Sequence, residues 1–214
     1  VYFGSKDNNL YAFDAASGTK LWTAATGDSI NSSPAVSNGV VYVGSSDKNA
    51  YAFDAATGAL KWKYATGDSI LSSPTISNGI LYVGSFDGKM YALDAVTGAI
   101  KWSTSTGGRI GSSPTVSNGV VYAGSYDNKL YAFDAVTGAI KWSTATGGRI
   151  LSSPTVSNGV VYAGSYDNNL YAFSVATGAV KWAAATGGTI RLASPTVLTF
   201  PGNVIMPGIS GDVQ

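Results

Sequence analysis

"YAFDAVTGAIKWSTATGG" (131–148) repeats, with few changes, the stretch "YALDAVTGAIKWSTSTGG" (91–108) that lies forty positions earlier. The same spacing of forty separates all the tryptophans of the chain, which are Trp22, Trp62, Trp102, Trp142 and Trp182. A period near forty with two-residue alternation is typical of propeller blades or similar arrays, and no helical 3.6-residue pattern competes with it. We therefore take the forty-residue unit as the building block of the fold.

One unit, residues 113–147, divides into four short strands. Small residues form the first ("SPTVS", 113–117), and β-branched and aromatic residues form the second ("VVYAGS", 120–125). The third ("LYAFD", 130–134) alternates, and the fourth ("AIKWSTAT", 139–146) carries the Trp. Turns rich in Asn, Asp and Gly separate them. This pattern predicts an all-β fold, a β-propeller of four-stranded antiparallel blades.

The segment "AFDAATGALKW" (52–62) has the form A-x-D-x-x-T-G-x-x-x-W, and it recurs in phase in all five units. It resembles the tryptophan-docking motif of the pyrroloquinoline quinone (PQQ) repeat family. That family includes quinoprotein dehydrogenases and propellers without the cofactor, among them the outer-membrane-assembly lipoprotein and extracellular sensor domains. Two copies depart from the pattern, with Ser17 in place of the Thr and Ser174 in place of the Asp.

The resemblance implies a structural role for the motif. Each Trp is expected to dock against the Gly-containing turn of a neighbouring blade, and the Asp and Thr are expected to cap the hairpin. The residues concerned are the five tryptophans together with Asp14, Asp54, Asp94, Asp134, Gly18, Gly58, Gly98, Gly138 and Gly178. The lysines that precede four of the tryptophans are expected to protect the outer edge strand.

The sequence leaves the number of blades open. We expect one domain over 1–214, with repeats at about 1–32, 33–72, 73–112, 113–152 and 153–193 and a partial unit at 194–214. The first unit lacks its innermost strand, which Ser194–Leu198 could supply to close a five-bladed ring. The alternative, which we favour, is a slice of a larger propeller or tandem array, because PQQ-type propellers usually have seven or eight blades. Residues 204–212 then read as a further, degraded copy of 160–167.

Composition excludes several classes of function. The chain has no Cys, His or Glu, and charged residues make up only 12% of it. A serine or cysteine nucleophile activated by His, and a zinc site of His or Cys, are therefore excluded. The aspartates lie mainly in turns, where Asp hydrogen-bonds its own backbone. We expect no catalytic residues, no metal and no cofactor, and the missing Cys pair and Glu argue against a PQQ-dependent dehydrogenase.

Charge and composition also restrict the partners and the compartment. Basic and acidic residues nearly balance at 13 and 12, without a basic run, which argues against nucleic acid as a partner. No apolar run approaches the length of a membrane span, so direct membrane insertion is not expected. A Cys-free chain rich in Ser, Thr and Asn suits an extracytoplasmic setting, in the periplasm or at the cell surface.

Differences between the repeats concentrate in two connections. The link from fourth to first strand changes from "GDSIN" (27–31) to "GGRIG" (107–111), and the second-to-third turn varies as well. In a propeller both connections lie on one face. The variable positions bring in Phe86, Arg109, Tyr126, Arg149, Tyr166 and Arg191. Because aromatic residues and Arg are enriched at binding hot spots, these six form the candidate binding face.

The sequence thus predicts a non-catalytic binding or scaffold module that engages a protein partner through this face. Two alternatives remain open: a structural surface-array protein with a capacity for self-association, and a domain that senses a small ligand at the propeller axis. Unconstrained drift of loop sequence would also explain the variation.

Overall fold

The computed structural model describes residues 1–191 and 193–197, and within them every regular element is a β-strand. The strands form five antiparallel sheets in chain order, called blades 1 to 5. Blade 1 contains β1 (Tyr2–Gly4), β2 (Asn9–Phe13) and β3 (Lys20–Ala25). Blade 2 contains β4 (Ala35–Ser37), β5 (Val40–Gly44), β6 (Asn49–Asp54) and β7 (Leu60–Ala65). Blade 3 contains β8 (Thr75–Ser77), β9 (Ile80–Gly84), β10 (Lys89–Asp94) and β11 (Ile100–Ser105). Blade 4 contains β12 (Thr115–Ser117), β13 (Val120–Gly124), β14 (Lys129–Asp134) and β15 (Ile140–Ala145). Blade 5 contains β16 (Thr155–Ser157), β17 (Val160–Gly164), β18 (Asn169–Ser174), β19 (Val180–Ala185). None of these residues forms a helix that could cross a membrane.

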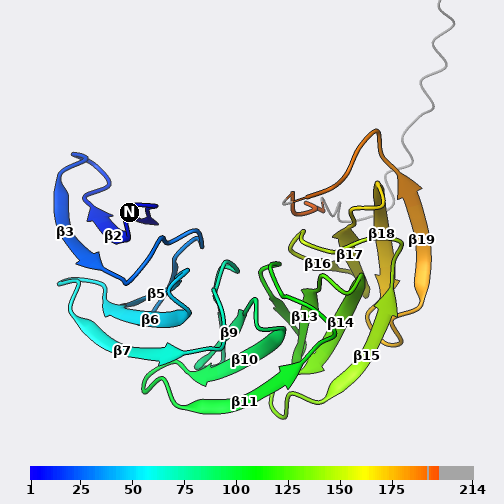
Figure 1. Cartoon of the computed structure of the whole chain (residues 1–214), viewed down its shortest axis with the longest axis horizontal. Coiled ribbons are helices and arrows are strands. Elements are labelled where there is room, and N and C mark those ends of the chain that lie inside the picture. Colours follow the sequence, from blue (N-terminus) through cyan, green and yellow to red (C-terminus); the bar gives the residue numbers. More distant parts are fainter. Residues whose placement is uncertain (192, 198–214) are drawn as a thin grey trace, which may run out of the picture.

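The blades follow one another around a common axis as an open arc (Figure 1). The short strands β4, β8, β12 and β16 face the axis and contact one another in that order, while β7, β11, β15 and β19 lie on the outside. Blade 1 has three strands, and residues 194–197 form no strand that would complete it. The closed five-bladed ring is therefore not formed by the described residues. Leu198 and residues 204–212 lie outside the described part of the chain.

Cross-strand rows explain how the blades pack. In blade 4, Tyr122 pairs with Ala132, and Ala132 pairs with Trp142. The small Ala lets the two rings on either side approach, with centroids 5.8 Å apart. Because side chains alternate across a strand, Val121 and Phe133 point to the other face of the same sheet.

Each pair of neighbouring blades shares one core. The Tyr82 and Trp102 face of blade 3 packs against the Val121 and Phe133 face of blade 4. Equivalent clusters join blades 1 and 2, blades 2 and 3, and blades 4 and 5. A blade therefore buries its two faces only between two neighbours, which is why the unit is repeated.

The turns carry the residues that their backbone geometry demands. Asn118 and Gly119, between β12 and β13, both have positive φ, at 48° and 73°. Asn-Gly is favoured in a two-residue hairpin of this kind because both central residues must adopt positive φ. The same Asn-Gly pair occupies the corresponding turn of blades 2, 3 and 5.

The outer-strand lysines have a more specific environment than edge protection alone. Lys61 and Lys101 lie 3.2 Å from Asp54 and Asp94, the aspartates of their own docking motifs. Lys141 lies 3.7 Å from Asp134. These exposed ion pairs connect the end of the third strand to the start of the fourth, across the docking turn.

Candidate functional site

One face of the arc carries both kinds of variable connection, and we call it the loop face. It is made by the second-to-third-strand turns (5–8, 45–48, 85–88, 125–128, 165–168) and by the links between blades (27–31, 67–71, 107–111, 147–151, 187–191). Backbone hydrogen bonds join the two sets, because Tyr126 N–H donates to Arg109 O and Tyr166 N–H donates to Arg149 O, both at 2.9 Å. The opposite face, called the hairpin face, carries the Asn-Gly turns and the docking turns.

The turn aspartates of the loop face act as clamps. Asp127 Oδ1 accepts from Lys129 N–H, while Oδ2 accepts from Tyr131 O–H at 2.6 Å and from Gly107 N–H at 3.0 Å. A Cβ at Gly107 would lie 2.6 Å from that Oδ2, so the close approach requires glycine. Asp47, Asp87 and Asp167 repeat the arrangement with Gly27, Gly67 and Gly147. These carboxylates are committed to holding the link between two blades.

The titration of these groups fits a structural role. Burial raises the pKa of Asp47, but hydrogen bonds from Tyr51, Gly27 and Asn49 outweigh it and hold the pKa below its ordinary value. Burial and the Asp47 carboxylate raise the pKa of Tyr51 to about 12. Tyr131 has a pKa of about 12, raised by burial and then by its bond to Asp127. Asp47 stays ionised and Tyr51 stays protonated at neutral pH, so the tyrosine donates and the aspartate accepts in the hydrogen bond between them.

Above these clamps the loop face brings together all six residues of the candidate binding face. The guanidinium carbons of Arg109, Arg149 and Arg191 lie over the rings of Phe86, Tyr126 and Tyr166, at 5.3, 5.2 and 5.7 Å from the ring centroids. These distances are within the range of cation–π attraction. Arg109 and Arg149 belong to the links that lead into blades 4 and 5. Each reaches back to the aromatic turn residue of the preceding blade. The three pairs, called the Arg–aromatic row, extend over blades 3 to 5.

The row is continuous at its centre. The rings of Phe86 and Tyr126 are 5.6 Å apart and inclined at 59°. A Cβ at Gly111 would lie 3.3 Å from both rings, so the absence of a side chain there leaves room for their contact. At the other end, Arg191 Nε–H donates to Tyr166 Oη at 3.3 Å. That hydrogen bond, followed by the charge of Tyr166, raises the pKa of Arg191.

The arginines are confined to one half of the loop face. Among the described residues, the only ion pairs are those of the outer-strand lysines, so no carboxylate lies within 4.0 Å of Arg109, Arg149 or Arg191. In blades 1 and 2 the corresponding links read "GDS" and carry Asp28 and Asp68 in place of the glycine, without an Arg. One half of the face thus carries Asp28 and Asp68 together with Lys6 and Lys48, and the other half carries three guanidinium groups held by aromatic rings.

A cavity of about 620 Å³ opens beside the row. Phe86 and Tyr126 form part of its wall, together with Leu71 and Leu151. The axial serines of successive units complete it: Ser33, Ser73, Ser113, Ser153 and Ser194. Three of these serines accept a hydrogen bond from the N–H of the serine one unit earlier, at 2.9–3.1 Å.

The docking-motif residues lie elsewhere, at the junctions between blades. Trp102 Nε1–H donates to Ala135 O at 3.1 Å, and the Trp102 ring lies against Gly138 of the next blade. Trp22, Trp62 and Trp142 make the same contacts with Gly58, Gly98 and Gly178. Asp134 Oδ1 accepts from Val136 N–H, Thr137 N–H and the Thr137 hydroxyl, and Asp14, Asp54 and Asp94 cap their turns in the same way.

The two ends of the arc lack these contacts. Trp182 has no following blade among the described residues and is 44% exposed, against 8% for Trp102. At the other end, a Cβ at Gly18 would meet nothing within 4 Å. These two members of the motif therefore fill no junction in the described structure.

Sequence reasoning missed the walls of the axial cavity and the role of Gly111. The serines are visible as "SSP" in four units, but small residues in the first strand do not by themselves indicate a cavity wall. Gly111 stands where other units have Asn31, Leu71 and Leu151, and that departure was the available signal.

Within residues 1–191 and 193–197, no three Asp side chains gather in a way that could hold a metal ion.

Comparison with known proteins agrees with this architecture. The crystal structure of BamB from Moraxella catarrhalis superposes with a TM-score of 0.75 at 25% sequence identity. The match covers 89% of this chain and 59% of that one, so the chain spans about three fifths of the length of this relative. A search of curated proteins finds no match.

The family described as outer membrane protein assembly factor BamB matches residues 6–110 and 102–213, which is nearly the whole sequence. The resemblance to the PQQ-repeat propellers and the predicted all-β blade fold are both confirmed by these findings. The chain belongs to the family of the outer membrane protein assembly factor BamB.

Proposed function

We propose that the chain is a non-catalytic protein-binding module that takes part in outer membrane protein assembly outside the cytoplasm. Membership of the BamB family supports the process, because the family is described as an assembly factor. The absence of His, Cys and Glu supports a role without catalysis, and the turn aspartates of the loop face are committed to holding the links between blades. The protein partner binds the loop face.

The Arg–aromatic row is the observation that carries this proposal. Its side chains are the types that dominate protein–protein binding energy, and its rings hold the guanidinium groups in place before a partner arrives. The planar edges of three guanidiniums remain available for charged or polar groups of the partner. The row also lies where the repeats differ most, whereas the docking turns of the hairpin face are nearly identical from unit to unit.

Site-specific photo-crosslinking in the native host tests the proposal. A photoreactive phenylalanine analogue replaces Tyr166, which keeps an aromatic ring in the row. The matched control places the same analogue at Val136, which is 75% exposed on the hairpin face. We expect a discrete crosslink to an envelope protein from position 166 and none from position 136. Equal crosslinking from both positions, or crosslinking from 136 alone, would contradict the assignment of the face.

A ligand-sensing role is the second candidate, and the axial cavity favours it. The cavity combines two aromatic rings with several hydroxyl groups, which is a suitable lining for an uncharged ligand with polar substituents. Thermal unfolding in the presence of neutral sugars would detect such binding as a rise in Tm that disappears in a Tyr126→Ala variant.

A further inference from the structure

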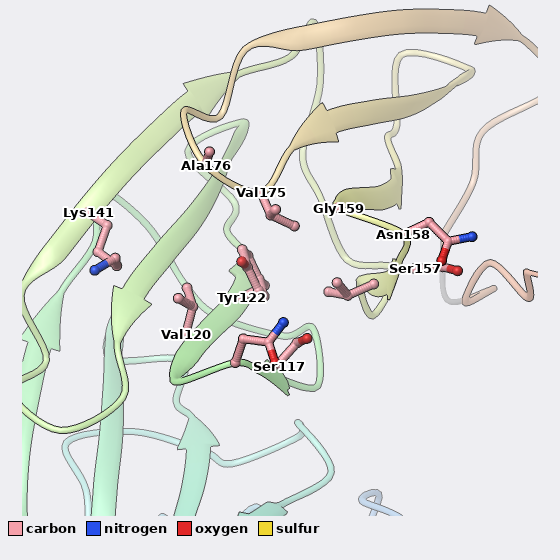
Figure 2. Close-up of a pocket in the computed structure, with 11 residues that line it drawn as sticks. Ser117, Val120, Tyr122, Lys141, Ser157, Asn158, Gly159, Val175 and Ala176 are labelled. Carbon is pink, nitrogen blue, oxygen red and sulfur yellow. The ribbon is translucent and has the colours of Figure 1, made fainter.

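A second cavity, of about 300 Å³, opens on the hairpin face between blades 4 and 5 (Figure 2). Tyr122, Val120 and Lys141 come from blade 4, and Val156, Val175 and Ala176 come from blade 5. The Asn-Gly turns of both blades form its rim. This cavity is separate from the loop face and from its Arg–aromatic row.

The junction between blades 4 and 5 differs from the others in one hydrogen bond. At the first three junctions the Tyr of the second strand donates its hydroxyl proton to an alanine carbonyl of the next blade. The bonds are Tyr2 to Ala55, Tyr42 to Ala95 and Tyr82 to Ala135, at 2.9–3.0 Å. At the fourth junction Trp142 keeps its bond to Val175 O, but Tyr122 makes no hydrogen bond to any described residue.

The sequence departure that accompanies this loss is local. The fifth docking motif reads "SVATG" (174–178), so Val175 stands where the earlier junctions have alanine. Val175 packs against the core cluster that contains Tyr122. The extra branched side chain occupies space beside the Tyr122 ring, and the cavity opens at this same junction.

Tyr122 is 98% buried, yet its hydroxyl is not sealed off, because no buried side-chain polar atom of the described residues lacks a partner. The hydroxyl group therefore has access to the cavity that its ring lines. Figure 2 shows the hydroxyl end of Tyr122 directed toward the side where Val175 and Ala176 lie. Burial raises the pKa of Tyr122, so the hydroxyl stays protonated and can donate.

Lys141 supplies a second donor. It lies 3.7 Å from Asp134, whereas Lys61 and Lys101 hold their aspartates at 3.2 Å. The Lys141 ammonium group is thus the least tightly paired of the three, and Lys141 is a lining residue of the cavity while Asp134 is not. Val120, Val156 and Val175 form the apolar part of the wall, and Ser117, Asn118, Ser157 and Asn158 add polar groups at the rim.

We propose that this cavity binds a short aliphatic carboxylate. The carboxylate accepts hydrogen bonds from the Tyr122 hydroxyl and the Lys141 ammonium group, and the hydrocarbon tail packs against the three valines. The lining contains no acidic side chain that would repel an anion. A positive charge and a buried hydroxyl donor beside three valines fit an amphiphilic anion better than a cation.

The test is a titration followed by two-dimensional amide NMR, with hexanoate and hexanamide as probes. We expect hexanoate to shift the signals of Asn158, Gly159 and Ala176 but not those of Asn78 and Gly79 at the junction of blades 2 and 3. Hexanamide, which has the same tail without the charge, should bind about tenfold more weakly, as expected for loss of a charge-assisted hydrogen bond. Equal binding of the two probes, or no shift with hexanoate, would overturn the proposal.

Matched tyrosine variants separate a binding role from a packing role. Tyr122→Phe should weaken hexanoate binding about tenfold without lowering the urea midpoint, because it removes no hydrogen bond within the protein. Tyr82→Phe should lower the urea midpoint without changing hexanoate binding. Val175→Ala restores the residue of the other junctions and should also reduce binding. A fall in midpoint for Tyr122→Phe as large as for Tyr82→Phe would overturn the inference.

Discussion

The blade junctions and the loop face both use aromatic rings, but they use them differently. At a junction, Trp102 is buried, donates a hydrogen bond to the next blade and lies against a glycine. On the loop face, Tyr126 carries a guanidinium group and borders an open cavity. The junction contact occurs four times with little change, whereas the Arg–aromatic pairs occur only in blades 3 to 5. The residues that repeat are those that every junction needs for stability. The residues that vary lie on a surface that the stability of the blades does not constrain.

The largest expected effect follows from removing a junction ring. Trp102→Ala should lower the free energy of unfolding by about 4 kcal/mol, because a buried Trp and its hydrogen bond are lost and a cavity remains. Urea denaturation followed by far-UV circular dichroism measures it. Trp182→Ala is the control, since that ring is 44% exposed and has no docking partner within residues 1–191 and 193–197, and it should cost less than about 1 kcal/mol. Similar losses for both variants would contradict the docking account.

Two glycines separate the cost of a steric clash with a Trp ring from the cost of a left-handed backbone conformation. Gly138 and Gly119 have nearly the same positive φ, 74° and 73°, but a Cβ at Gly138 would lie 2.6 Å from the Trp102 ring and one at Gly119 would meet nothing within 4 Å. Gly119→Ala should cost about 1 kcal/mol from the left-handed backbone alone. Gly138→Ala should cost about 1–3 kcal/mol more, because the ring must be displaced. Equal costs in urea denaturation would mean that the Trp–Gly contact carries no constraint.

The smallest effect concerns the charged cap of a docking turn. Hydrogen bonds from Thr97 and the Lys101 ion pair lower the pKa of Asp94 from 3.8 to about 2. A carboxyl whose pKa is depressed by folding contributes stability above its unfolded pKa, and this contribution is lost as pH falls through the folded value. Asp94→Asn should therefore flatten the decline in urea midpoint between about pH 4 and pH 2. An unchanged pH profile would show that the cap does not couple to folding.

The sequence was sufficient to predict the blades, because the strands, the turns and the docking motif recur at a fixed period. It also pointed to the six residues of the candidate binding face, since "GGR" replaces "GDS" in two links and the second-to-third-strand turns vary as well. Two features depend on the position of neighbouring blades, and a single repeat cannot indicate them. One is the stacking of Arg149 from one link on Tyr126 of the preceding blade. The other is the free hydroxyl of Tyr122, which depends on Val175 fifty-three positions away.

Whether the blades close into a ring depends on more than the sequence of one repeat. The forty-residue unit defines one blade, but the number of blades in a ring depends on the small rotation from one blade to the next. The rotation angle between blades is set by how each docking tryptophan, such as Trp102, packs against the next sheet. A single docking motif does not determine it. The sequence favoured a slice over a closed five-bladed ring, and the structure shows the five sheets as an open arc (Figure 1).

The most direct measurement compares folding and partner capture for one set of variants. Arg109, Tyr126, Arg149 and Tyr166 are replaced together by Ala, and Lys61, Lys101 and Lys141 are replaced by Ala in the control. Binding is measured for the protein that crosslinks to position 166, with each variant quantified as folded protein by its urea transition. We predict that the loop-face variant folds and loses affinity by roughly a hundredfold, while the control binds within about twofold of the natural protein. A folded loop-face variant that binds as tightly as the control would contradict the assignment of this face as the binding surface.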